Sequence, residues 1–294
     1  MMRVRDYATL PATQFPGYEV VPEHAKAGLL IVHGIAEHAN RYGHVAAALA
    51  SMGIACFIYD QQGHGLFPGT RTHVRDFADF ARDLESVGNA VQDRFPALPL
   101  FVWGHSMGSI VVALAAIDGL SWAEGVITSG CALHAMPKLD GIRGAAVRIA
   151  AALAPRLRIG LRIDGTKLSQ VEEIQHQHMS DPLVPRTASL KLLYGFALAC
   201  RKCNANLSRI TKPWLAVHGA ADTVCPPSGS ESLIGELGST DKQLVTYPRL
   251  LHEVHNEDDR SRAILFELMT RWILERCDRR SNLCRNPEAP VPAG

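Results

Sequence analysis

The feature that most constrains the fold of this 294-residue chain is a series of short, predominantly apolar runs. Runs rich in Val, Ile, Leu and aromatic residues, without polar alternation, are typical of strands buried on both faces in parallel sheets. Helical patterns separate them. The sequence therefore predicts an α/β fold with a mostly parallel central sheet flanked by helices. The runs occupy residues 28–32, 54–59, 100–103, 125–128, 214–217 and 243–247.

Between these runs, apolar residues recur at spacings of three and four, as they do on one face of a helix. This pattern covers residues 77–91 and 264–273, and residues 110–117 form a helical segment without any charge. The alternation of strand and helix breaks between about residues 131 and 210, where the chain is helix-like throughout. We expect this stretch to be a helical cap insertion over one end of the sheet.

Composition sets the broad class of protein. The chain is 47% hydrophobic and 20% charged, with a net charge of +1, so nothing in its overall charge indicates a nucleic-acid partner. No uncharged apolar run is long enough to span a bilayer, and the first residues lack the apolar core of a secretory signal. We therefore expect a cytoplasmic enzyme. The end of the chain has too few apolar residues to pack, so we expect a disordered tail over residues 277–294.

The cysteines do not indicate a disulfide framework or a metal site. There are seven, an odd number for a chain of this length, and reduced thiols are expected in a cytosolic protein. Cys200 and Cys203 form a C-x-x-C, but no second pair or histidine cluster completes a zinc site. The simpler interpretation places them on consecutive turns of a helix, and we expect no metal.

The sequence G-H-S-M-G at residues 104–108 lies between the predicted strand at 100–103 and the uncharged helical segment. A serine on such a sharp strand-to-helix turn is the setting of a nucleophile elbow, and the flanking glycines remove side chains that would block the turn. The following helix directs its N-terminal N–H groups toward the same place. Ser106 is therefore the candidate nucleophile.

A serine nucleophile needs a base, and the base needs an acid that orients it. Asp222 follows the predicted strand at 214–217, and His252 follows the strand at 243–247. The order serine, aspartate, histidine is that of α/β hydrolases, in which the residues meet beyond the carboxyl ends of the strands. His255 is a rival base, three residues further on.

Two backbone N–H groups are expected to stabilise the oxyanion. Met107 follows the nucleophile and supplies one. The loop after the strand at 28–32 supplies the other, and Ile35, which follows Gly34, is the candidate there. A serine hydrolase of this kind requires no cofactor or metal.

Six motifs follow one another along the chain: H-G-I-A-E-H-A-N-R-Y, Y-D-Q-Q-G-H-G, G-H-S-M-G, D-P-L-V, H-G-A-A-D-T-V and H-E-V-H-N-E. Their order resembles the monoacylglycerol lipase-like branch of the α/β hydrolases, which includes lysophospholipase-like enzymes. The resemblance covers residues 15–276, the predicted folded domain. It implies Ser106, Asp222 and His252 as the triad, Ile35 and Met107 as oxyanion donors, and a cap with an apolar acyl-binding channel over residues 131–210.

The chain departs from that branch at two places outside the predicted triad. Ser109 stands where many members have a third glycine, and Leu66-Phe67-Pro68 replaces small polar residues after G-H-G. Met107 also argues against the related proline iminopeptidases, which usually carry tryptophan there. The resemblance predicts cleavage of single-acyl lipid esters such as monoacylglycerols. The alternatives are a lysophospholipase, a general carboxylesterase, an acyltransferase and a binding protein without turnover.

The segment between Lys138 and Lys167 is unusually basic. It carries seven basic residues against Asp140 and Asp164, interspersed with apolar residues. Such a segment can rest on an anionic membrane surface, or it can form a cap helix with its arginines in water. Peripheral membrane contact through the cap is thus one of two open interpretations. The basic residues are Lys138, Arg143, Arg148, Arg156, Arg158, Arg162 and Lys167.

Overall fold

The computed structural model describes residues 3–4, 8–10, 12–137, 139–161 and 163–285. A nine-stranded sheet forms its centre, with strand order β1-β3-β5-β4-β6-β7-β10-β11 and β2 paired to β3. Strands β5, β4, β6, β7, β10 and β11 run parallel, and β3 is antiparallel to β5. The strands are β1 (Arg3–Val4), β2 (Ala8–Thr9), β3 (Pro16–Val21), β4 (Ala27–Val32), β5 (Ile54–Tyr59), β6 (Leu100–His105), β7 (Ala123–Ser129), β10 (Trp214–Gly219) and β11 (Lys242–Tyr247).

The predicted parallel sheet is confirmed, since each of the six apolar runs lies in one of its parallel strands. Strands β4, β5, β6 and β10 are buried at every position. The last strand, β11, has half-buried and exposed positions and no fully buried one. It lies at the edge of the sheet, so fewer neighbours cover it than cover the central strands.

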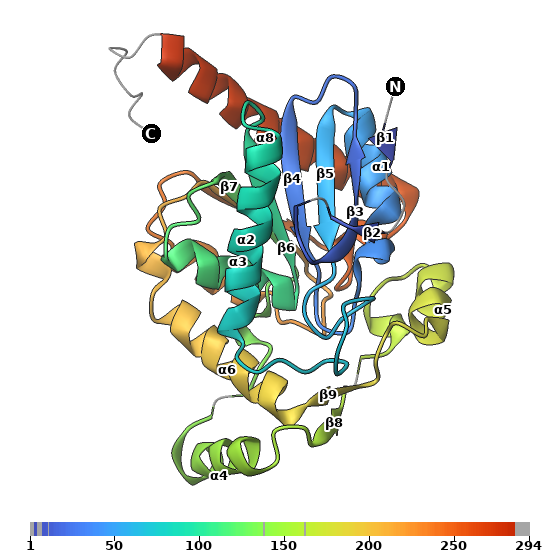
Figure 1. The fold of residues 1–294 in the computed structure, drawn as a ribbon, viewed down its shortest axis with the longest axis vertical. Helices are drawn as coiled ribbons and strands as arrows, with labels where there is room; N and C mark the ends of the chain where they lie inside the picture. Colours follow the sequence, from blue (N-terminus) through green and yellow to red (C-terminus); the bar gives the residue numbers. More distant parts are fainter. Residues whose placement is uncertain (1–2, 5–7, 11, 138, 162, 286–294) are drawn as a thin grey trace.

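Helices cover both faces of the sheet (Figure 1). On one face α2 and α3 build a core with alternate residues of β4 and β6, and α6 and α7 extend it. On the other face α1 and α8 pack against the remaining residues of those strands. These helices are α1 (Gly43–Ser51), α2 (Ala78–Arg94), α3 (Met107–Ile117), α6 (Leu190–Asn204), α7 (Ser228–Glu236) and α8 (Asp259–Arg285).

The chain between β7 and β10 gathers beyond one end of the sheet (Figure 1). It contains α4 (Gly141–Leu153), α5 (Glu172–Ser180) and α6, as the helical pattern predicts. The prediction that this stretch is helical throughout is wrong, because β8 (Arg158–Gly160) and β9 (Thr187–Ser189) form an antiparallel pair within it. The pairing of β8 with β9 joins positions far apart in the sequence, which a local helical pattern does not reveal. Below, the cap means residues 131–210.

Short 3₁₀ helices complete the described elements: η1 (Ala39–Tyr42), η2 (Ala132–His134), η3 (Gly165–Lys167), η4 (Leu207–Arg209) and η5 (Val254–Asn256). Within the described ranges, the structure has no helix with the length and apolar character needed to cross a bilayer.

The C-terminal helix is longer than its apolar pattern suggests. Helix α8 continues to Arg285, so the first residues of the predicted disordered tail are helical. The sequence does not indicate this extension, because the residues from Asp278 to Arg285 are mostly polar and show no apolar periodicity. The remainder of the predicted tail, residues 286–294, lies outside the described residues.

Candidate active site

Ser106 occupies a strained turn between β6 and α3. Its φ of 52° and ψ of −121° lie where L residues rarely stay, a conformation that costs about 1–3 kcal/mol. The two motif glycines permit it. A Cβ at Gly104 would lie 2.4 Å from the carbonyl oxygen of Gly108, and one at Gly108 would lie 2.1 Å from that of Val32. The predicted nucleophile elbow therefore has the backbone form that such a turn requires.

Two neighbours fix the surroundings of the Ser106 side chain. The Ser106 N–H donates to Ser129 O at 2.9 Å, which ties the elbow to the end of β7. The hydroxyl oxygen lies 4.0 Å from Cys225 Sγ. Burial and the charge of Asp222 raise the pKa of that thiol well above its ordinary value, so it is a neutral neighbour at physiological pH.

Asp222 lies just beyond β10 and accepts four hydrogen bonds. Oδ1 receives the backbone N–H of Val224 at 2.8 Å and that of Cys225 at 2.9 Å. Oδ2 lies 2.7 Å from His252 Nδ1 and 3.1 Å from His218 Nε2. Burial raises its pKa, but hydrogen bonds from His218 and His252 outweigh that effect and hold the pKa well below its usual range. Asp222 is therefore a fixed carboxylate anion.

His252 is buried and paired with this carboxylate. Burial lowers the pKa of His252, but its hydrogen bond to Asp222 and that residue's charge raise the pKa above its ordinary value overall. Its ring centre lies 4.8 Å from that of His105, the residue before Ser106. A Cβ at Gly130 would contact both rings, at 2.9 Å from His252 and 3.3 Å from His105. No hydrogen bond joins Ser106 Oγ to His252 in the part of the chain that the structure describes, so their direct contact stays a prediction.

The rival base, His255, lies elsewhere. Its ring stacks on Tyr42 at 5.0 Å between centres and packs edge-on against Trp103. Burial lowers its pKa to about 3. Among the described residues, no hydrogen bond joins His255 to Asp222, so the geometry favours His252 as the base.

The two predicted oxyanion donors flank the elbow. Met107 is the first residue of α3, and Ile35 follows β4 in a loop that closely approaches the serine. A Cβ at Gly34 would lie only 2.9 Å from Ser106 Cβ. Gly34 N–H donates to Glu37 Oε2 at 3.0 Å, which fixes the turn that carries Ile35. Ile35 and Met107 therefore both lie in segments next to Ser106, and their role as oxyanion donors stays a prediction.

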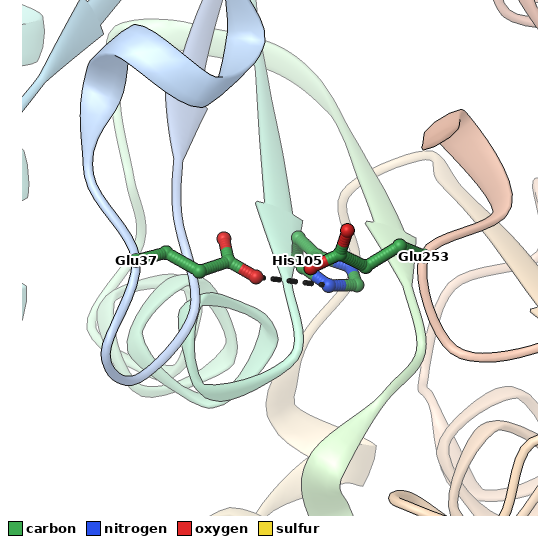
Figure 2. A group of neighbouring side chains, drawn as sticks. All are labelled: Glu37, His105 and Glu253. Atoms are coloured by element: carbon green, nitrogen blue, oxygen red, sulfur yellow. Dashed lines mark ion pairs between the residues drawn. The ribbon is translucent and has the colours of Figure 1, made fainter. Parts of the chain in front are cut away.

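A buried polar cluster lies behind these residues, and sequence reasoning did not single it out. Figure 2 shows Glu37 and Glu253 on either side of the His105 ring, with Glu37 Oε1 3.5 Å from His105 Nε2. Burial raises the pKa of Glu37, and the nearby Glu253 charge adds to that rise. Arg41 donates two hydrogen bonds to Glu253, at 2.7 and 2.9 Å, and overcomes the effect of burial to lower the pKa of Glu253.

The same cluster has the donor types of a metal site. One ligand atom each from Glu37, His105 and Glu253 lies within 4.8 Å of the others. However, Arg41 already neutralises Glu253, and its guanidinium would lie beside any bound cation. Tyr42 O–H also occupies Glu37 Oε2 at 2.7 Å. The cluster is therefore better explained as a hydrogen-bonded support for the loop of Ile35 and for the elbow.

A residue of the D-P-L-V motif joins the cap to the core. Asp181 Oδ2 lies 2.7 Å from His38 Nε2, in the loop after β4. This hydrogen bond holds the chain after α5 beside the turn of the predicted oxyanion loop. Cys200 and Cys203, which form the C-x-x-C, are both buried on α6. This agrees with the interpretation that places them on consecutive turns of a helix.

Comparisons with known proteins agree with this architecture. A family model described as serine aminopeptidase S33 matches residues 23–259. The chain is 31% identical to a monoacylglycerol lipase of Mycolicibacterium smegmatis over 250 residues, covering 84% of this chain and 87% of the relative. It is 32% identical to the monoglyceride lipase of Rattus norvegicus over 255 residues, covering 85% and 83%.

The chain is also similar in structure to a solved monoacylglycerol lipase. The crystal structure of Paleococcus ferrophilus monoacylglycerol lipase matches with a TM-score of 0.75 at 26% identity, covering 87% of this chain and 96% of that one. The resemblance drawn from the six motifs is thereby confirmed, and so is the fold class it implies.

Proposed function

Because the chain belongs to the monoacylglycerol lipase-like branch of the α/β hydrolases, we propose that it hydrolyses carboxylic esters of single-acyl lipids, with monoacylglycerols as the main substrates. One observation carries the proposal. It is the buried Asp222–His252 pair, joined by a 2.7 Å hydrogen bond, in a chain that also holds a serine on a strained elbow. The names of the relatives support the choice of substrate.

In the proposed reaction, Ser106 Oγ attacks the ester carbonyl while His252 Nε2 takes its proton. The negative charge of Asp222 stabilises the imidazolium that forms. The N–H groups of Ile35 and Met107 stabilise the oxyanion, an interaction that typically contributes about 3–4 kcal/mol per donor. His252 then protonates the leaving alcohol, and a water molecule activated by the same histidine releases the acid from Ser106.

The experiment that tests the substrate class compares rates on 1-monoacylglycerols, lysophosphatidylcholine and p-nitrophenyl esters of graded chain length. We expect long-chain monoacylglycerols to give the highest kcat/KM. Preference for lysophosphatidylcholine would identify a lysophospholipase, and turnover of short activated esters alone would identify a general carboxylesterase. Product transfer to an added alcohol beyond its partition with water would identify an acyltransferase.

We further propose that the cap contacts membranes through α4. This helix buries little beyond Gly144 and Ala151 and exposes large apolar side chains, with Ile142 90% and Leu153 82% exposed. Exposed arginines lie among them on and after α4, at Arg143, Arg148 and Arg156. Apolar side chains flanked by cations fit the boundary of an anionic bilayer. Two further basic residues of the predicted segment, Lys138 and Arg162, lie outside the described residues.

Flotation with phosphatidylserine-containing liposomes tests this contact. Replacing Arg143, Arg148 and Arg156 with glutamine is expected to weaken binding by about 100-fold, since each contributes about 1 kcal/mol near an anionic surface. Replacing Ile142 and Leu153 with serine should weaken binding also in neutral liposomes. The matched control replaces Arg271 and Ile264, both exposed on α8. Equal flotation of wild type and both cap variants would contradict the proposal.

A further inference from the structure

A second histidine lies on the proposed catalytic aspartate. His218 is in β10, four residues before Asp222, and its Nε2 lies 3.1 Å from Asp222 Oδ2 and 3.0 Å from the carbonyl oxygen of Cys225. Its Nδ1 lies 2.7 Å from the Oγ of Ser230, in the first turn of α7. The side chains of His218 and Asp222 are both fully buried.

The partners of His218 determine where its proton lies. Nε2 faces two oxygens that can only accept, the ionised Asp222 carboxylate and the Cys225 carbonyl, so Nε2 must carry a hydrogen. Nδ1 faces a hydroxyl, which can donate to it. A neutral ring with hydrogen on Nε2, accepting from the Ser230 O–H, therefore satisfies every polar atom of this group.

We infer that His218 is a positioning residue for the proposed catalytic aspartate: its Nε2–H holds Asp222 Oδ2 in line with His252 Nδ1, and Ser230 holds the His218 ring. The inference rests on the proposed function of Asp222 and His252. The hydrogen bonds then form a continuous series from Ser230 through His218 and Asp222 to His252.

Two features make His218 more than a packing residue. The two backbone bonds to Oδ1 leave the carboxylate free to tilt about the axis through that oxygen, and only His218 and His252 bond to Oδ2 among the described residues. Burial also leaves water no access to replace a lost donor. Removing His218 would therefore let Oδ2 move out of line with His252.

The position of Oδ2 also affects the pKa of His252, because the hydrogen bond and the charge of Asp222 raise that pKa. Without the His218 donor, Oδ2 moves out of line, both effects weaken, and His252 loses its proton at a lower pH. His252 must be neutral to act as a base, so activity falls as the pH falls through its pKa. Loss of the His218 donor is therefore expected to move this acid limb downward, by about half a pH unit. The other titratable groups around His252 are Glu37, Glu253, His105 and His255, and the variants below leave them unchanged.

The test compares His218→Gln with His218→Asn. The glutamine amide nitrogen can take the place of Nε2 and donate to Asp222, whereas the shorter asparagine reaches only the Ser230 side. Groups that hold metal-ligating side chains from behind typically contribute 10–100-fold, and His218 holds Asp222 in a comparable way. For a carboxylate that keeps three other hydrogen bonds, we expect kcat to fall about 10-fold in His218→Asn and to stay within about twofold of wild type in His218→Gln.

The readouts are the acid limb of kcat/KM and the NMR signal of the proton between His252 Nδ1 and Asp222. In His218→Asn the acid limb should move downward and the downfield signal should weaken, and His218→Gln should restore both. Equal behaviour of the two variants, or an unmoved acid limb in His218→Asn, would overturn the inference. The NMR measurement needs no substrate, so it decides the inference even if wild type hydrolyses no ester and the proposed function fails.

If the variants at position 218 do not fold, Ser230→Ala tests whether His218 positions Asp222. It removes the donor to His218 Nδ1 and is expected to lower kcat about threefold and to move the acid limb the same way. Ser239→Ala is the matched control, because Ser239 is also buried and its hydroxyl donates to the Asp241 carbonyl oxygen, away from His218. A Ser230→Ala profile equal to that of Ser239→Ala would overturn the inference.

Discussion

Replacing Ser106 with alanine is expected to lower ester hydrolysis by at least about 10⁴-fold without loss of the fold. Alanine keeps the Cβ, and with it the backbone strain of the elbow, so only the attacking oxygen disappears. The N–H groups of Ile35 and Met107 remain, and they account for the small rate over water that such variants retain. The measurement is the rate of hydrolysis of the preferred ester by each protein, and circular dichroism checks that the variant is folded.

Cys225→Ala is the matched control for this variant. Cys225 Sγ lies 4.0 Å from Ser106 Oγ and is the other nucleophilic atom recorded beside it. Because the pKa of this thiol is raised well above its ordinary value, little thiolate is available, and we expect Cys225→Ala to keep most of the activity. Full activity in Ser106→Ala together with loss in Cys225→Ala would assign the attack to the thiol and contradict the proposed mechanism.

The sheet and the positions of the candidate residues could be predicted because their signals are local. An apolar run needs only its own residues to indicate a buried strand, and a glycine-flanked serine between strand and helix indicates its own turn. The positions of Asp222 and His252 follow from topology, since loops after neighbouring parallel strands meet at one edge of the sheet. Strands β10 and β11, which precede these residues, are indeed neighbours.

The supporting contacts could not be predicted in the same way. Arg41 and Glu253 are 212 positions apart, and His38 and Asp181 are 143 apart, so no periodicity or motif spacing pairs them. His218 is a different case. It lies in the H-G-A-A-D motif that contains Asp222, but as a residue of an apolar strand it looks like a packing residue. Only the side-chain geometry shows that its ring faces the carboxylate.

Asp222→Asn is expected to lower kcat about 10⁴-fold while leaving the fold almost unchanged. Asparagine has the same shape, but its two ends differ chemically. The backbone N–H groups of Val224 and Cys225 both donate to Oδ1, so the amide oxygen must take that place. The NH₂ group then lies at the Oδ2 position, 2.7 Å from His252 Nδ1, where a donor now faces the ring. His252 must accept there and carry its hydrogen on Nε2, so it cannot take the proton of Ser106.

The same substitution conflicts with His218, whose Nε2–H would face the new NH₂ group at 3.1 Å, donor against donor. The variant therefore tests both the proposed triad and its support, and kcat is measured beside that of Asp241→Asn. Asp241 is a matched control because it pairs with Arg276 and Arg279 at the surface, away from β10's carboxyl end. We expect Asp241→Asn to retain wild-type kcat. If Asp222→Asn also retained it, His252 would not depend on this carboxylate for its tautomer, and the Ser106–His252–Asp222 mechanism would have to be abandoned.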